Sequence, residues 1–180
     1  MGIENKNQIK EMKKKKIKII GGNRFVGKKV AQTLFKEHML ILLSFMEVTG
    51  LTAKSIHQNA AAVTFDDGYA DNLDVVAPIM DDLKIPFTVF VTSDYVRSTS
   101  KKYLSLNALG DLASLSGVTI GAHGSSHCRL TDCNDVELKK EIVDSKKFLE
   151  DTVGNPIESM SYPHGSANKR VINEVKSAGY

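Results

Sequence analysis

The sequence predicts an α/β fold in which strands and helices alternate around a parallel sheet that is either open or closed into a barrel. Two observations lead to this fold class. Short apolar runs of strand length recur along the chain, and segments with the periodicity of amphipathic helices separate them. The 180 residues, of which 42% are hydrophobic and 25% charged, suit one soluble globular domain and leave little room for a second complete one.

The first fifty residues contain one predicted βαβ unit behind a basic leader. Residues 17–20 and 39–45 are expected strands, and residues 25–36 an expected helix. The leader at 1–16 has no aromatic residue interleaved with its lysines for base stacking, and no amphipathic basic helix follows it. A solvated segment is therefore favoured over a site for a nucleic acid or an anionic membrane. Charged residues interrupt the apolar stretch that follows, which predicts no signal peptide and a cytoplasmic protein.

From residue 60 onward the alternation continues. The predicted strands are 60–65, 87–92, 118–122 and 158–161, and the predicted helices are 72–83, 104–115, 135–153 and 169–178. The helix at 135–153 is the best defined of these. Asn134 and Glu137 have the spacing of a capping box before it, and Gly154 followed by Pro156 ends it.

Hydropathy argues against a membrane-spanning protein, and the cysteine content argues against a small protein held together by disulfides. The longest apolar run, 39–46, lies between His38 and Glu47 and is shorter than the roughly 18 residues that a membrane-spanning helix needs, so no transmembrane segment is expected. Cys128 and Cys133 are too few for a disulfide framework and lack CxxC spacing. Both are expected to be free thiols.

Two adjacent carboxylates, Asp66 and Asp67, directly follow the predicted strand at 60–65. Active sites in parallel sheets gather at the carboxyl ends of the strands. Neighbouring carboxylates repel each other unless a cation or a shared proton relieves them, so this pair suggests a metal ligand beside an acid or base. A turn that ends the strand and caps the next helix is the other interpretation, because Asp and Gly also suit such turns.

Two histidines, His123 and His127, follow the predicted strand at 118–122. Imidazoles four residues apart on a helical turn face one side and can bind one metal ion, although surface histidines show the same spacing by chance. Both motifs fall at the same end of their strands. Together they offer an Asp and two His, a usual ligand set for a hydrolytic Zn²⁺ with open positions for water.

The predicted strand at 158–161 leads into a third motif, Ser-Tyr-Pro-His-Gly at 161–165, whose Pro and Gly fix a turn that could aim a backbone N–H into the same site. With these motifs in this order, residues 60–180 resemble the polysaccharide deacetylases of the NodB-homology type, carbohydrate esterase family 4. Residues 64–69 match the family's first motif, and residues 123–127 match its HxxxH motif. Residues 161–165 are a variant of the family's third motif.

The resemblance implies a deformed (β/α) barrel and a metal-dependent hydrolase that removes N-acetyl or O-acetyl groups from an oligo- or polysaccharide. It implies that Asp67, His123 and His127 bind a divalent metal, with Zn²⁺ as the expected ion, and that Asp66 is the general base. The backbone N–H of His164 would stabilise the charge that develops on the carbonyl oxygen. Substrate contacts would come from Tyr69, Tyr162 and Pro163.

Three features depart from the family pattern. Ser161 stands where many members have an arginine that orients the base, and Gly124 replaces the Ser or Thr that usually follows the first motif histidine, which removes one hydroxyl. The later motifs, which supply a tryptophan-lined wall and the histidine that protonates the leaving amine, do not follow, and the chain has no Trp. An incomplete barrel is therefore expected. A catalytically weak or inert truncated or fused protein is the alternative to an active enzyme.

The N-terminal segment has a different likeness. Residues 18–27 look like the phosphate-binding turn of NAD-dependent epimerases, and Glu47 lies where an acidic ribose ligand would be expected. However, Arg24 replaces the middle glycine, and no YxxxK pair follows in the chain. A scaffold role for residues 17–50 is therefore favoured over a second alternative, an NAD-binding oxidoreductase fragment.

Overall fold

The computed structural model describes residues 47–48 and 60–180, and the structural statements below concern these residues. The predicted leader at 1–16, the strands and helix predicted between residues 17 and 45, and the epimerase-like turn lie outside the described residues. The division of the chain into these segments and a domain at 60–180 stays a prediction.

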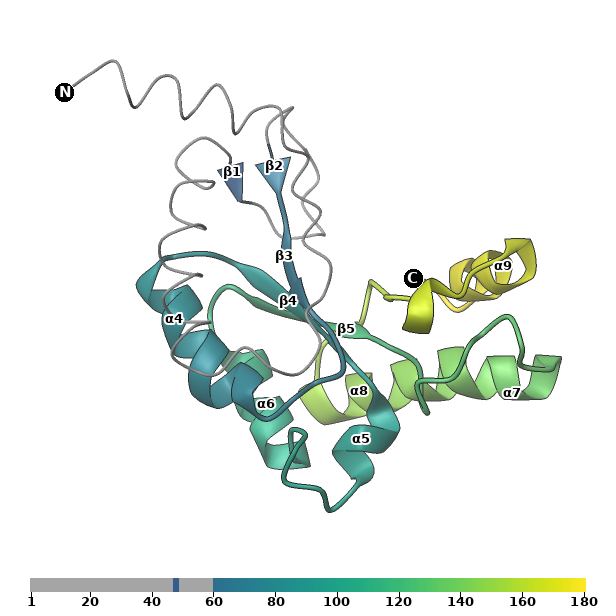
Figure 1. The fold of residues 1–180 in the computed structure, drawn as a ribbon, viewed down its shortest axis with the longest axis horizontal. Coiled ribbons are helices and arrows are strands. Elements are labelled where there is room, and N and C mark those ends of the chain that lie inside the picture. The colour runs from purple at the N-terminus through teal and green to yellow at the C-terminus, as the bar shows by residue number, and fades with distance from the viewer. Residues whose placement is uncertain (1–46, 49–59) are drawn as a thin grey trace.

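The described residues form short parallel strands in two sheets (Figure 1). β1 (Glu47–Val48) pairs with β2 (Ala60–Ala61). A three-stranded sheet has the order β3 (Val63–Phe65), β4 (Phe87–Val91) and β5 (Val118–Ala122), with all pairs parallel. The α/β class and the parallel sheet predicted from the sequence are thus confirmed.

Two of the predicted strands differ from expectation. The strand predicted at 60–65 is interrupted at Ala62, so its two halves belong to different sheets. The strand predicted at 158–161 is reduced to a single parallel bridge between Met160 and Ala122 at the end of β5. Two backbone hydrogen bonds of 2.9 Å on either side of Met160 hold this segment in the position of a fourth strand.

The predicted helices are present, with their ends shifted by at most two residues. In chain order the helical segments are η2 (Asn72–Val76, a π-helical turn), α4 (Ala77–Asp82), α5 (Ser93–Arg97), α6 (Leu106–Ser114), α7 (Asp135–Lys139), η3 (Lys140–Asp144, a π-helical turn), α8 (Ser145–Val153), η4 (Pro163–Gly165, a 3₁₀ turn) and α9 (Lys169–Ser177). The one-turn helix α5 was not predicted. Among these described residues, the helices are too short or too polar to cross a membrane.

β4 lies at the centre of the fold and is buried along its whole length. Its sequence, Phe-Thr-Val-Phe-Val, has no exposed position, as is typical of parallel strands covered on both faces. Figure 1 shows α4, α6 and α8 along one side of the three-stranded sheet. The core between them contains, among others, Ala77, Met80, Val89, Val91, Leu109, Leu112 and Leu149.

A second, smaller apolar cluster lies between α7 and α9 and contains Leu130, Leu138, Ile142, Val171 and Val175. Because it packs the segment after residue 127 against the C-terminal helix, it fixes the loop that follows β5.

The long helix that begins at α7 has the capping arrangement that the sequence predicts. Asn134 Oδ1 accepts hydrogen bonds from the N–H groups of Val136 and Glu137, both at 3.0 Å, and Glu137 Oε2 accepts one from the N–H of Asn134 at 2.9 Å. At the other end Gly154 has φ 71°, a left-handed conformation that ends α8 and that glycine adopts without strain. The predicted capping box and glycine stop are confirmed.

Replacing Asn134 with Ala removes the acceptor for two backbone N–H groups. We expect the free energy of unfolding to fall by about 1 kcal/mol, measured by chemical denaturation followed with circular dichroism. Asn134→Asp keeps an acceptor at this position and should retain most of the stability. Equal losses in the two variants would contradict the capping role.

Candidate metal centre

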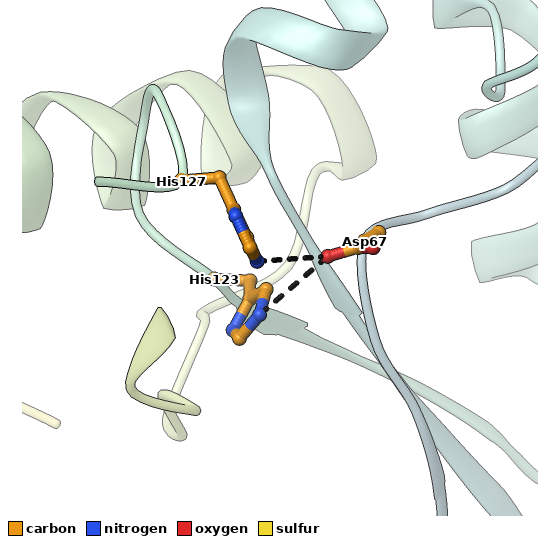
Figure 2. Close-up of side chains that lie close together, drawn as sticks. All are labelled: Asp67, His123 and His127. Carbon is orange, nitrogen blue, oxygen red and sulfur yellow. Dashed lines mark ion pairs between the residues drawn. The ribbon is translucent and has the colours of Figure 1, made fainter. Parts of the chain in front are cut away.

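Asp67, His123 and His127 meet at the carboxyl edge of the three-stranded sheet. Asp67 follows β3, and both histidines follow β5. Oδ1 of Asp67 lies 3.2 Å from Nε2 of His127 and 3.6 Å from Nε2 of His123 (Figure 2). The possible ligand atoms of all three residues lie within 4.8 Å of one another. Ligand atoms about 2.0–2.2 Å from a tetrahedral zinc ion are about 3.3–3.6 Å apart, so the spacing suits a shared ion.

Hydrogen bonding sets the tautomer of His123. Its Nδ1 lies 2.9 Å from the carbonyl oxygen of Ser161, which can only accept, so Nδ1 carries the proton. In the neutral ring, Nε2 then presents a lone pair toward Asp67. Burial also lowers the pKa of His127, although the charge of Asp67 opposes this shift, and the lowering favours the neutral imidazole that binds metals.

Three atoms face one another in the cluster: Oδ1 of Asp67 and the Nε2 atoms of His123 and His127. The carboxylate oxygen is a hydrogen-bond acceptor, and each Nε2 can act as one when it carries no proton. Oδ1 of Asp67 is buried and has no hydrogen-bond partner. A buried carboxylate oxygen without a donor is costly, and it is stabilised when a cation binds between it and neighbouring lone pairs. The donor set of one carboxylate and two imidazoles therefore fits a divalent metal ion.

The backbone around the site adopts an uncommon conformation. Asp67, His127 and His164 have φ values of 73°, 64° and 57°, in the left-handed region that non-glycine residues seldom adopt. Among the described non-glycine residues, Lys84 is the one other example. Such conformations persist where the surrounding structure fixes them, and they cluster at functional sites.

Asp66 is exposed to solvent next to Asp67. Partial loss of hydration is the main cause that raises the pKa of Asp66 above its ordinary value. The negative charge of Asp67 adds to this rise, whereas His123 and His127 oppose it. The structure thus has a second, accessible carboxylate next to the carboxylate of the cluster.

The third motif approaches the same site through η4. The His164 side chain is exposed, its Nε2 lies 3.1 Å from the carbonyl oxygen of His127, and the centres of the two rings are 4.5 Å apart. Pro163 is buried and lies beside Gly124, and Tyr162 packs against the second apolar cluster. The turn therefore contacts the loop that carries His127.

Tyr69 belongs to a stack of aromatic rings beside the site. Its ring centre lies 5.2 Å from that of Tyr103, which in turn lies 4.2 Å from that of Tyr95. Tyr95 lies 6.0 Å from the ring of His127, measured between centres. Tyr95 and Tyr103 were not predicted as site residues, because neither belongs to a motif and both are distant from Tyr69 along the chain.

Glu141 is a further residue of the site that the sequence interpretation missed. It is 5% exposed, and its carboxylate accepts hydrogen bonds from the N–H of Ser125 at 2.7 Å, the N–H of Ser126 at 2.9 Å and the Ser126 hydroxyl at 2.7 Å. These donors lie between the two histidines of the cluster. Glu141 therefore holds the loop that positions both imidazoles.

The same contact explains the glycine at position 124. Gly124 has φ 74°, and a Cβ atom there would lie 2.9 Å from Oε2 of Glu141. A Ser or Thr at this position would displace the carboxylate. The loop is thus held by Glu141 rather than by a side-chain hydroxyl at position 124.

Replacing Glu141 with Ala leaves the buried N–H of Ser125 without an acceptor and also removes the acceptor for the N–H and hydroxyl of Ser126, which is exposed. We expect a loss of about 2–3 kcal/mol in the free energy of unfolding, because each unsatisfied buried group costs about 1–3 kcal/mol and part of this cost is recovered by water. Chemical denaturation of the full chain measures it.

Glu158→Ala is the matched control, because Glu158 is exposed and its side chain has no hydrogen bond or ion pair to the other described residues. This control should change the stability by less than about 0.5 kcal/mol. Similar losses in both variants would show that Glu141 does not hold the loop.

Comparison with known protein families gives one match over most of the chain. The family model described as polysaccharide deacetylase matches residues 53–180. This range includes the strand ends that carry Asp66, Asp67 and the two histidines of the cluster.

Two curated proteins are similar in sequence. YxkH of Bacillus subtilis, which is named as a polysaccharide deacetylase, is 25% identical over 127 residues, covering 71% of this chain and 44% of that protein. A peptidoglycan-N-acetylglucosamine deacetylase of Bacillus cereus is 29% identical over 147 residues, covering 78% of this chain and 64% of that protein. The chain thus spans about half the length of these relatives.

Among solved structures, the Streptococcus pyogenes deacetylase PplD in complex with acetate has a similar fold, with a TM-score of 0.76. The two proteins are 18% identical, and the match covers 88% of this chain and 76% of that chain. The predicted fold class, part of a (β/α) barrel of this type, is therefore confirmed.

Proposed function

The chain belongs to the polysaccharide deacetylase family, and on this premise we propose that it is a metal-dependent hydrolase that removes N-acetyl or O-acetyl groups from a carbohydrate. The observation that carries the proposal is the cluster of Asp67, His123 and His127, in which a buried carboxylate oxygen without a hydrogen-bond donor faces two imidazole nitrogens.

Asp67, His123 and His127 would hold the metal, with Zn²⁺ as the proposed ion. When bound, a divalent cation supplies positive charge that lowers the pKa of water toward neutrality and polarises the carbonyl group of the substrate. The hydrogen bond from His123 Nδ1 to the Ser161 carbonyl supports this role, because it keeps Nε2 free and fixes the orientation of the ring.

Asp66 is the proposed general base. Its exposed carboxylate lies one residue from a proposed ligand and can take a proton from the attacking water. As this water attacks the acetyl carbon, negative charge develops on the carbonyl oxygen, and the backbone N–H of His164 is the proposed hydrogen-bond donor to it. The bond between the His164 imidazole and the His127 carbonyl supports this assignment by holding the turn against the site.

The proposed substrate is an N-acetylated oligo- or polysaccharide. Tyr69 and Tyr162 are half-buried and remain proposed contacts to the sugar, whereas buried Pro163 would act by fixing the turn. The relative from Bacillus cereus is named for N-acetylglucosamine in peptidoglycan, which makes glucosamine-based polymers the first substrates to test.

Asp66→Asn separates the base from the metal ligands. We expect it to lower acetate release from N-acetylated oligosaccharides by about 10²- to 10⁴-fold, the contribution of a positioned acid or base, with the zinc content unchanged. His127→Ala should lower both activity and zinc content, with zinc affinity reduced at least about 100-fold, because even changes to residues behind the ligands cost 10–100-fold.

Acetate release is measured with and without a chelator, and zinc content by atomic absorption. Asp111→Asn, an exposed carboxylate on α6, is the control and should leave both unchanged. Loss of zinc in Asp66→Asn would mean that the two carboxylates have the opposite roles. A zinc-loaded wild-type chain that releases no acetate would instead support the inert alternative.

A further inference from the structure

The two cysteines of the chain come close together in the loop that follows the metal centre. Both are free thiols, and the Sγ atoms of Cys128 and Cys133 lie 3.0 Å apart. This is only about 1 Å more than the sulfur–sulfur distance of a disulfide bond. A turn closed by the hydrogen bond from the N–H of Asp132 to the carbonyl of Arg129 brings the two residues together.

Contacts to the C-terminal part of the chain hold this loop at several points. Arg170 lies 2.6 Å from the carbonyl oxygen of Cys133, and the Thr131 and Ser166 hydroxyls are 2.7 Å apart. Together with the bond between His164 and His127 described above, they keep the sulfur atoms near each other without a covalent bond. A dithiol already held at short range loses little further freedom when it closes.

The two thiols differ in accessibility. Cys133 is buried, and burial, followed by its hydrogen bond to Cys128, raises the pKa of the Cys133 thiol to about 12. Cys128 is half-buried. An oxidant from solution therefore reaches Cys128 first, and Cys133 is placed to react with it afterwards.

We propose that Cys128 and Cys133 form a dithiol site that is converted to an intrachain disulfide by exchange with a low-molecular-weight disulfide. The Cys128 sulfur attacks one sulfur of the oxidant, and one thiol leaves. The Cys133 sulfur then attacks Cys128 in this mixed disulfide, and the second thiol leaves. Each cysteine loses one proton, and the two electrons reduce the oxidant to two thiols.

The bond would join the two ends of the loop between the metal centre and helix α7. Cys128 directly follows His127, and Cys133 directly precedes the helix cap Asn134. Oxidation would therefore fix the loop behind one of the proposed metal ligands. The dithiol site itself depends only on the geometry of the loop and is independent of the proposed hydrolase activity.

The position of Arg129 between the cysteines allows a direct test. The full chain is incubated with glutathione disulfide, denatured in acid, and treated with N-ethylmaleimide. We expect the reduced chain to take two labels, and the oxidised chain to take none and to be about 2 Da lighter than the unlabelled reduced chain. Trypsin cleaves after Arg129, so without reductant the peptides 103–129 and 130–139 should be recovered as one linked pair.

Cys128→Ser and Cys133→Ser are the matched controls, and each should give no linked pair and keep one reactive or glutathione-modified sulfur. The proposal would be overturned if the wild-type chain kept both labels, carried glutathione on Cys128 with Cys133 still labelled, or formed disulfide-linked dimers. These outcomes are read from the wild-type protein alone, so they do not depend on whether the variants fold.

Discussion

The convergence of one buried carboxylate oxygen and two imidazole nitrogens is the constraint on which the rest of the site depends. The carboxylate oxygen of Asp67 and the Nε2 atoms of His123 and His127 face one another at a sheet edge, and the oxygen has no hydrogen-bond donor. The surrounding structure maintains this arrangement through the Ser161 carbonyl, which orients one ring, and through Glu141, which holds the loop between the two histidines. A cation bound among these atoms would stabilise the buried carboxylate oxygen that lacks a donor.

Much of this arrangement could be predicted from the sequence. A parallel strand covered on both faces is a short, mostly apolar run, as in the fully buried β4, and β5 is a similar run whose first two residues are half-buried. Both strands were therefore found at or within one residue of their ends. The carboxyl ends of parallel strands meet at one edge, and therefore the polar residues after 60–65 and 118–122 were expected to converge. The capping box at Asn134 depends on local contacts alone, which is why its sequence pattern was sufficient.

Features that depend on contacts between distant segments could not be predicted. Glu141 was assigned to a predicted amphipathic helix, where a carboxylate is usually solvated, but the helix contains a π-helical turn at η3 and Glu141 is buried against Ser125 and Ser126. The stacking of Tyr95 and Tyr103 likewise follows from the fold. The segment at 158–161 has the pattern of a strand, yet it contributes one bridge beside β5. The role of residues 17–50 stays a prediction.

Asp67, His123 and His127 are proposed to bind one metal ion between them. Anomalous diffraction at the zinc absorption edge from crystals of the zinc-loaded chain tests this proposal most directly. We expect one strong peak at about 2.0–2.2 Å from Oδ1 of Asp67 and from Nε2 of both histidines. A peak elsewhere, for example at Cys128 and Cys133, with none among these three side chains, would contradict it.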